Sequence, residues 1–98
     1  MPAYEEQNTH YRHIRLKEEE EKNIWKIMGK EGKVLKAITS RSRCKYIWYN
    51  KENGVVEIWG PHENIMTADE LVKERINKIT MSINQEEKKE EEDNEHNK

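Results

Sequence analysis

The chain contains a single cysteine, Cys44, among its 98 residues, so no disulfide can form within it. A chain without internal disulfides fits a reducing compartment. No apolar run approaches the roughly 18 residues that a membrane-spanning helix needs. The first ten residues, MPAYEEQNTH, lack the basic and then apolar order of a secretory signal peptide. These absences predict a soluble intracellular protein, cytoplasmic or nuclear, that does not enter a membrane.

Apolar residues are also scarce, since 33% of the residues are hydrophobic and 39% are charged. This supply is thin for the whole length, so part of the chain is expected to stay unfolded. Residues 1–11 are polar and predict a flexible N-terminal arm. Residues 84–98 contain no apolar residue and predict a disordered acidic tail. One domain is expected between them, over residues 12–83.

Catalytic and metal-binding patterns are missing as well. The sequence shows no nucleophile–base pattern, no paired catalytic carboxylates and no Walker-type lysine motif, so we do not expect an enzyme. His10 and His13 have a ligand-like spacing of three, but a metal site needs about four convergent ligands. The other candidate ligands stand apart in the sequence: Cys44, His62 and His96. No metal and no cofactor is therefore expected.

Charge is distributed unevenly, although the formal net charge is only −2. Residues 22–51 carry nine basic residues and one acidic residue, Glu31. Residues 86–98 carry seven acidic and three basic residues. Charge blocks of this kind inform about partners rather than about the fold. The basic block indicates a polyanionic partner.

The spacing of apolar residues predicts six elements in the order β-α-α-β-β-α. HIRL (13–16) predicts a strand, and KNIWKIM (22–28) predicts a helix that the acidic run 18–21 either precedes as a solvated connection or begins as a first turn. A second helix follows Gly32 and ends in the polar turn TSRSR. CKYIWY and VVEIW predict a hairpin around Asn53-Gly54, and a last helix runs from His62 to about Met81. We expect a two-layer α+β domain, with three antiparallel strands packed against three helices.

The stretch IMGKEGKVLKAI (27–38) places Gly29 and Gly32 in a four-residue turn between the first two helices. Backbone N–H groups at the start of the second helix have no intrahelical partners and suit an anion. Glycine lets a phosphate backbone approach such a turn closely. The basic side chains that would add positive charge there are Lys30, Lys33 and Lys36.

This stretch resembles the motif of the type I K-homology (KH) family: two apolar residues, Gly-x-x-Gly, then apolar residues at helical spacing. The element order matches that family, as does VVEIWGP followed by a helix with Ala68 and Leu71. The resemblance covers roughly Ile14 to Ile79. It implies binding of about four nucleotides of single-stranded RNA or single-stranded DNA in a groove, held by the GxxG loop. We favour RNA over DNA as the partner.

The resemblance also assigns roles to individual positions. The loop that would hold the sugar–phosphate backbone is Gly29, Lys30, Glu31 and Gly32. The residues that would lie under or beside the bases are Ile24, Trp25, Lys26 and Ile27. The residues that would line the groove floor and its opposite side are Leu35, Tyr46 and Trp48, and the hairpin residue that could reach a phosphate or a base edge is Lys51.

Three positions depart from the family pattern. Trp25 and Lys26 stand where many members have small residues, and Trp25 either stacks on a base or fills the pocket. Glu31 repels phosphate and brings the net charge of the loop to zero. Arg43 replaces a glycine that often precedes the second strand.

Other interpretations compete with nucleic-acid binding. The GxxG turn could be an ordinary corner between helices, and Ile24, Ile27, Leu35 and Ile38 are expected to be mainly core. The alternative function is a protein-interaction or dimerisation module. Its surface would be the outer face of the sheet, away from the helices, where a homodimer or protein partner would contact Ile47, Tyr49 and Trp59. In the competing interpretation, these three residues are scattered over the surface and partly covered by the N-terminal arm.

Overall fold

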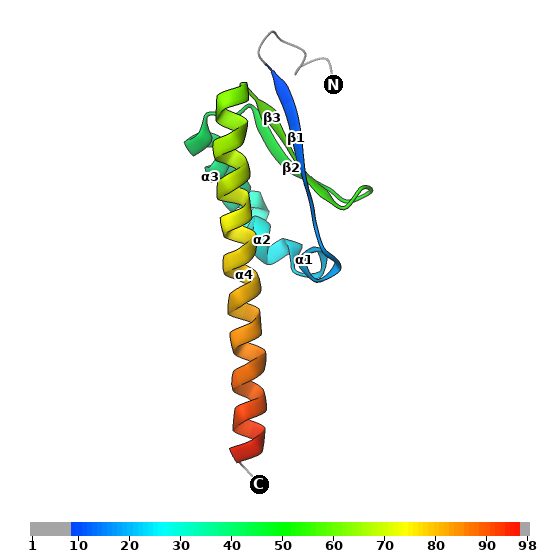
Figure 1. Ribbon diagram of the computed structural model, residues 1–98, viewed down its shortest axis with the longest axis vertical. Helices are drawn as coiled ribbons and strands as arrows, with labels where there is room; N and C mark the ends of the chain where they lie inside the picture. The colour runs from blue at the N-terminus through cyan, green and yellow to red at the C-terminus, as the bar shows by residue number, and fades with distance from the viewer. Residues whose placement is uncertain (1–8, 97–98) are drawn as a thin grey trace.

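The computed structural model describes the backbone of residues 9–96 and the side chains of residues 9–85. It confirms the α+β class (Figure 1). The elements in chain order are β1 (His10–Arg15), α1 (Glu18–Lys22), α2 (Ile24–Met28), η2 (Lys30–Gly32), α3 (Lys33–Ser42), β2 (Tyr46–Asn50), β3 (Val55–Gly60) and α4 (His62–His96). No helix in this described part is both long and apolar enough to cross a bilayer.

The three strands form one antiparallel sheet, as predicted, and their order in the sheet is β1-β3-β2. β2 and β3 are joined by a tight turn in which Gly54 has a φ of 64°, a left-handed conformation that favours glycine. Figure 1 shows α2, α3 and α4 on one side of the sheet. The domain therefore has two layers, and one face of the sheet carries no helix in the described residues.

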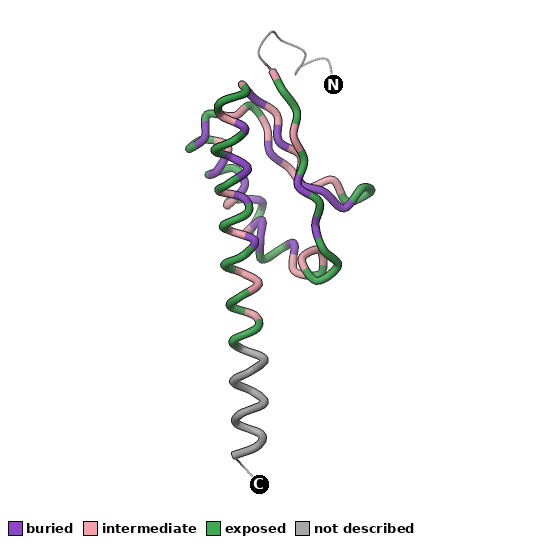
Figure 2. Tube along the Cα trace, in the orientation of Figure 1, coloured by how far each residue is buried: buried purple, intermediate pink, exposed green. Residues whose placement is uncertain are grey.

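The core lies between this sheet and the helices, and Figure 2 shows the buried positions facing each other across the two layers. Ile58 and Val56 of β3 are fully buried there, as are Leu35 of α3 and Val72 of α4. Burial of each such aliphatic side chain contributes about 1.5–3 kcal/mol. The apolar residues that recur at helical spacing in the sequence are thus the residues that the helices bury in the core.

The helix predicted over 22–28 begins at Ile24, and Asn23, whose backbone (φ −109°, ψ 19°) is not helical, separates it from a short helix before it. The Asn23 side-chain amide donates to the Glu19 carbonyl at 2.9 Å and closes α1. The Glu20 carboxylate accepts the Lys17 backbone N–H at 2.8 Å, an acidic contact that suits a helix N-terminus. The acidic run is therefore a short helix of its own.

Both ends of the domain differ from the prediction. β1 begins at His10, so His10 and Tyr11, predicted to lie in the flexible arm, pair with Gly60 and Trp59. Residues 1–8 of that arm lie outside the described residues. The last helix does not end near Met81 but continues to His96, in place of a disordered tail from residue 84. Glutamate, lysine and glutamine favour helices, and no glycine or proline follows Pro61 to stop this one.

The prediction that Ile47 and Tyr49 of β2 lie on the outer face of the sheet was wrong. Ile47 pairs with Ile58 and lies in the core with only 2% of its surface exposed. Tyr49 is on the same helix-covered side, where partial burial and the nearby Glu21 carboxylate raise its pKa. Both faces of β2 are apolar in sequence, and a strand reverses its faces with each residue, so alternation alone could not orient it. Trp59 does lie on the face away from the helices.

Candidate nucleic-acid interface

The GxxG loop has an unusual backbone between α2 and α3. Three of its four residues have positive φ angles: 81° at Gly29, 57° at Glu31 and 73° at Gly32. The Gly29 N–H donates to the Trp25 carbonyl at 3.0 Å and ends α2, and the Gly32 N–H donates to the Gly29 carbonyl at 3.0 Å. The loop is therefore a closed, defined turn.

Space as well as conformation requires glycine at both ends of the loop. A Cβ atom at Gly29 would come within 2.7 Å of Val34 Cγ2, and one at Gly32 would meet the ring of Trp48. An L-amino acid side chain is disfavoured at these φ angles in any case. The two glycines thus have a structural cause that does not depend on any ligand.

Positive charge surrounds the loop. α3 begins at Lys33, directly after Gly32, so its first N–H groups lack partners within the helix and carry the positive end of its dipole. The lysines in the loop and within four residues of it in sequence are all exposed: Lys26, Lys30, Lys33 and Lys36. Glu31, also exposed, is the acidic residue within the loop. This arrangement favours an anion at the start of α3.

Trp25 presents a large aromatic surface beside this charge. It lies on α2 and 75% of its surface is exposed, whereas its neighbour Ile24 is 4% exposed. Trp25 is therefore not packed into the core, and both of its predicted roles, stacking on a base or filling the ligand pocket, stay predictions. An exposed indole can stack on a base.

Several predicted site residues belong to the core instead. Ile24, Ile27 and Leu35 are at most 4% exposed and pack in the main cluster, so they support the surface and offer none of their own to a base. This agrees with their competing interpretation as core residues. Lys51 is exposed in the turn after β2.

Tyr46 and Trp48 lie on the open face of the sheet, because Ile47 between them faces the core. Trp48 nevertheless reaches the loop, because its half-buried side chain packs against the core cluster and its ring lies against Gly32. Tyr46 is opposite Trp59 and forms part of the sheet surface. Only Trp48 of the two is thus a direct neighbour of the GxxG loop.

Sequence reasoning missed a residue that holds the loop in place. Arg75 of α4 donates from Nε to the Ile27 carbonyl at 3.1 Å and from Nη2 to the Lys26 carbonyl at 2.8 Å. The last carbonyls of a helix have no donors within the helix, so the guanidinium group satisfies the end of α2. The contact spans 48 residues of sequence, and the one available signal was a basic residue beside the apolar positions Val72 and Ile76.

A second contact fixes α4 across β1. The buried Asp69 carboxylate pairs with Arg12 Nε at 3.0 Å and with Lys73 Nζ at 2.9 Å. Since α4 carries both Arg75 and Asp69, it links the sheet to α2 and to the loop that follows it.

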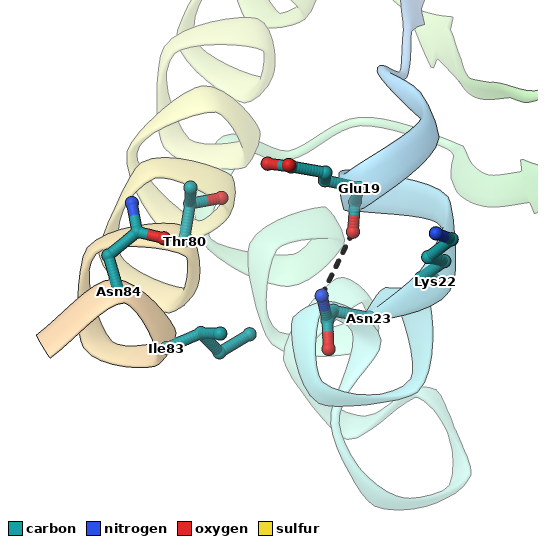
Figure 3. A pocket seen from close by; sticks show the side chains of 6 residues that line it. All are labelled: Glu19, Lys22, Asn23, Thr80, Ile83 and Asn84. Atoms are coloured by element: carbon teal, nitrogen blue, oxygen red, sulfur yellow. Dashed lines mark hydrogen bonds between the residues drawn. The ribbon is translucent and has the colours of Figure 1, made fainter. Parts of the chain in front are cut away.

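The clearest small hollow is elsewhere, between α1 and α4 (Figure 3). Its lining residues are Glu19, Lys22, Asn23, Thr80, Ile83 and Asn84. It lies at the start of α2, whereas the GxxG loop lies at its end, and none of the predicted site residues lines it. The described residues also contain no group of three or more side chains placed to hold a metal ion.

Comparison with known proteins gives one match that covers most of the domain. The family model for the KH domain matches residues 12–74, nearly two-thirds of the chain, from β1 through the loop and hairpin into α4. No curated protein sequence matches the chain significantly. KH domains are non-catalytic modules that bind single-stranded nucleic acid. With its strand order, its helices on one face and a match of this extent, the chain belongs to the KH domain family.

Proposed function

We propose that this domain binds about four nucleotides of single-stranded nucleic acid, RNA in preference to DNA, with the GxxG loop against the sugar–phosphate backbone. The observation that carries the proposal is the loop itself. Its positive φ angles at Gly29, Glu31 and Gly32 form a compact turn directly before α3, and exposed lysines lie on both sides of it. A phosphate there would meet the N-terminus of α3 and mobile ammonium groups at once.

The residues around the loop have separate roles in this proposal. Lys30 supplies the nearest charge, while Lys33 and Lys36 extend it along α3. Trp25, with 75% of its surface exposed, stacks on a base, a contact worth about 1–3 kcal/mol. Glu31 opposes phosphate and keeps the affinity low.

The alternative function, a protein-interaction module, was predicted to use the outer face of the sheet, and most of the residues predicted for that face are not on it. Ile47 is in the core and Tyr49 lies on the helix-covered side, so only Trp59 of the three predicted contacts is placed as that function required.

The test replaces Lys30 and Glu31 together with aspartate. Aspartate tolerates left-handed φ angles better than most residues, so the variant should fold with an unchanged circular dichroism spectrum. Binding to a random pool of short single-stranded RNA, measured by fluorescence anisotropy, should weaken by at least about tenfold, or 1.4 kcal/mol. Equal binding by the folded variant and the wild type would refute the phosphate role of the loop.

The matched control is Lys78→Asp, which changes charge by the same amount on α4. Lys78 is exposed and lies two positions after the buried Ile76, so it points away from the core side of the helix. This variant should bind RNA as the wild type does.

A further inference from the structure

The solvent side of α3 carries positive charge and no negative charge. The buried side of this helix consists of Leu35, Ile38 and Ser42, and the 3.6-residue repeat places the exposed positions opposite them. The residues of this exposed side, which we call the basic α3 face, are Lys33, Lys36, Ala37, Ser40, Arg41 and the helix-ending residue Arg43. Every long side chain on the face is therefore a lysine or an arginine.

The four cations of the basic α3 face have no acidic partners. No aspartate or glutamate stands in residues 32–51, so no ion pair at helical spacing can form within α3. Among the side chains of residues 9–85, none forms an ion pair with these cations either. Solvent-exposed helices usually mix both signs of charge. The exposed residues of α4 show this mixture: Glu70, Lys73, Glu74 and Lys78.

Three of the four cations stand where they lower the stability of the fold. Lys33 and Lys36 lie in the first four residues of α3, at the positive end of the helix dipole, where acidic residues would be favoured. Arg43 has a φ of 59°, a left-handed conformation that glycine adopts at lower cost. Only Arg41, in the last turn, has a charge that suits the dipole. The fold alone thus does not account for this set of charges.

We propose that the basic α3 face binds the phosphates of nucleotides that flank those held at the GxxG loop, so this inference rests on the proposed function. The face begins at Lys33, directly after Gly32, and a strand with one phosphate at the loop reaches it without a break. The helix rises about 12 Å from Lys33 to Arg41. Arg41 and Arg43 each meet one flanking phosphate, and phosphate contacts tolerate any base sequence.

The composition of the face favours a nucleic acid over a protein partner. Ala37 and Ser40, the residues between the cations, are small, so the face offers no large apolar side chain to bury. The cores of protein interfaces are instead rich in aromatic residues and poor in charge, with lysine depleted. A stripe of lysine and arginine on one helix face suits a phosphate backbone, whose condensed counterions these side chains displace.

The experiment measures how salt changes the affinity of the full-length protein for mixed-sequence single-stranded RNA of about four and about 12 nucleotides. Each phosphate contact adds about 0.7 to the slope of log affinity against log salt. The double variant Arg41→Gln, Arg43→Gln should therefore have a slope shallower by about 1.4 for the long strand and an unchanged slope for the short one. A change that only weakened α3 would not separate the two strands in this way.

Two control variants accompany this measurement. Arg41→Lys, Arg43→Lys keeps both charges and should keep the wild-type slopes. Arg15→Gln makes the same change as the test variant at an exposed position of β1, on the face of the sheet away from the helices, and should alter neither slope.

Each other outcome has a fixed meaning. Equal long-strand slopes in the wild type and the glutamine variant overturn this inference and leave the proposed function intact. Unchanged short-strand binding in the Lys30→Asp, Glu31→Asp variant overturns the proposed function instead, and the long-strand slopes still test α3 by itself. If sedimentation shows a wild-type dimer that the glutamine variant dissociates, acidic residues of a second copy occupy the face and the inference is wrong.

Discussion

The indole ring of Trp48 lies against Gly32, and this contact joins the edge strand of the sheet to the loop before α3. Gly32 also has a φ of 73°, so conformation and space both exclude a side chain there. The last glycine of the loop is therefore fixed by a strand residue 16 positions later in the chain.

Gly32→Ala should destabilise the domain by about 2–3 kcal/mol, because the new methyl group meets the ring in addition to the cost of the left-handed backbone. Urea denaturation measures this loss. Trp48→Leu should remove part of it, so the double variant should be more stable than the sum of the single effects predicts. Strict additivity would show that the ring does not restrict Gly32.

Glu31→Asn should strengthen both folding and binding. Glu31 has a φ of 57°, and asparagine adopts this conformation at lower cost, so we expect about 0.5–1 kcal/mol of added stability. Loss of the negative charge should also tighten binding of single-stranded RNA. Glu31→Gln separates the two effects, since it removes the charge and leaves the backbone preference unchanged: affinity should rise with no change in thermal stability.

Arg43→Gly should stabilise the domain by about 1 kcal/mol, because Arg43 ends α3 with a φ of 59°. The Arg43 and Cys44 N–H groups close the helix on the Ser40 and Thr39 carbonyls at 3.3 and 3.1 Å, and glycine keeps both bonds. The control is Arg41→Gly, the same change two residues earlier within α3, which should destabilise by about 0.5–1 kcal/mol. If thermal denaturation shows that both substitutions change the stability in the same direction, the left-handed backbone at Arg43 is contradicted.

Tyr11 should ionise late and in a distinct step, because partial burial and the hydrogen bond to the Glu57 carboxylate raise its pKa to about 12. The folded state retains this proton above pH 10, where the unfolded chain loses it. The contribution of the protonated Tyr11 hydroxyl to the free energy of unfolding is thus complete below pH 10 and is lost as pH rises toward 12. Tyrosinate absorbance of the wild type and Tyr11→Phe should differ only in that late step, and an identical titration curve would disprove the contact with Glu57.

How much the sequence could predict depended on whether the signal was local. The GxxG turn, the hairpin at Gly54 and the core face of α4 follow from residues close together in sequence, and the structure has all three. The orientation of β2 did not follow, since Ile47 and Trp48 are both apolar and only the packing of Ile58 against the helices selects one face.

Two further features depended on distant or competing effects. The bonds from Arg75 to the end of α2 span half the chain, so no local pattern could indicate them. The spacing of apolar residues does not predict the continuation of α4 beyond residue 84, because no apolar residue follows, although helix-forming glutamate and lysine need no core to favour a helix.

The central claim is that Lys30 and its loop neutralise phosphate. The most direct measurement is the salt dependence of affinity for short single-stranded RNA in the wild type, Lys30→Gln and the control Lys78→Gln. Each phosphate contact contributes about 0.7 to the slope of log affinity against log salt for a single strand. The account predicts a slope shallower by about 0.7 in Lys30→Gln and unchanged in Lys78→Gln. The same slope in all three proteins would contradict it.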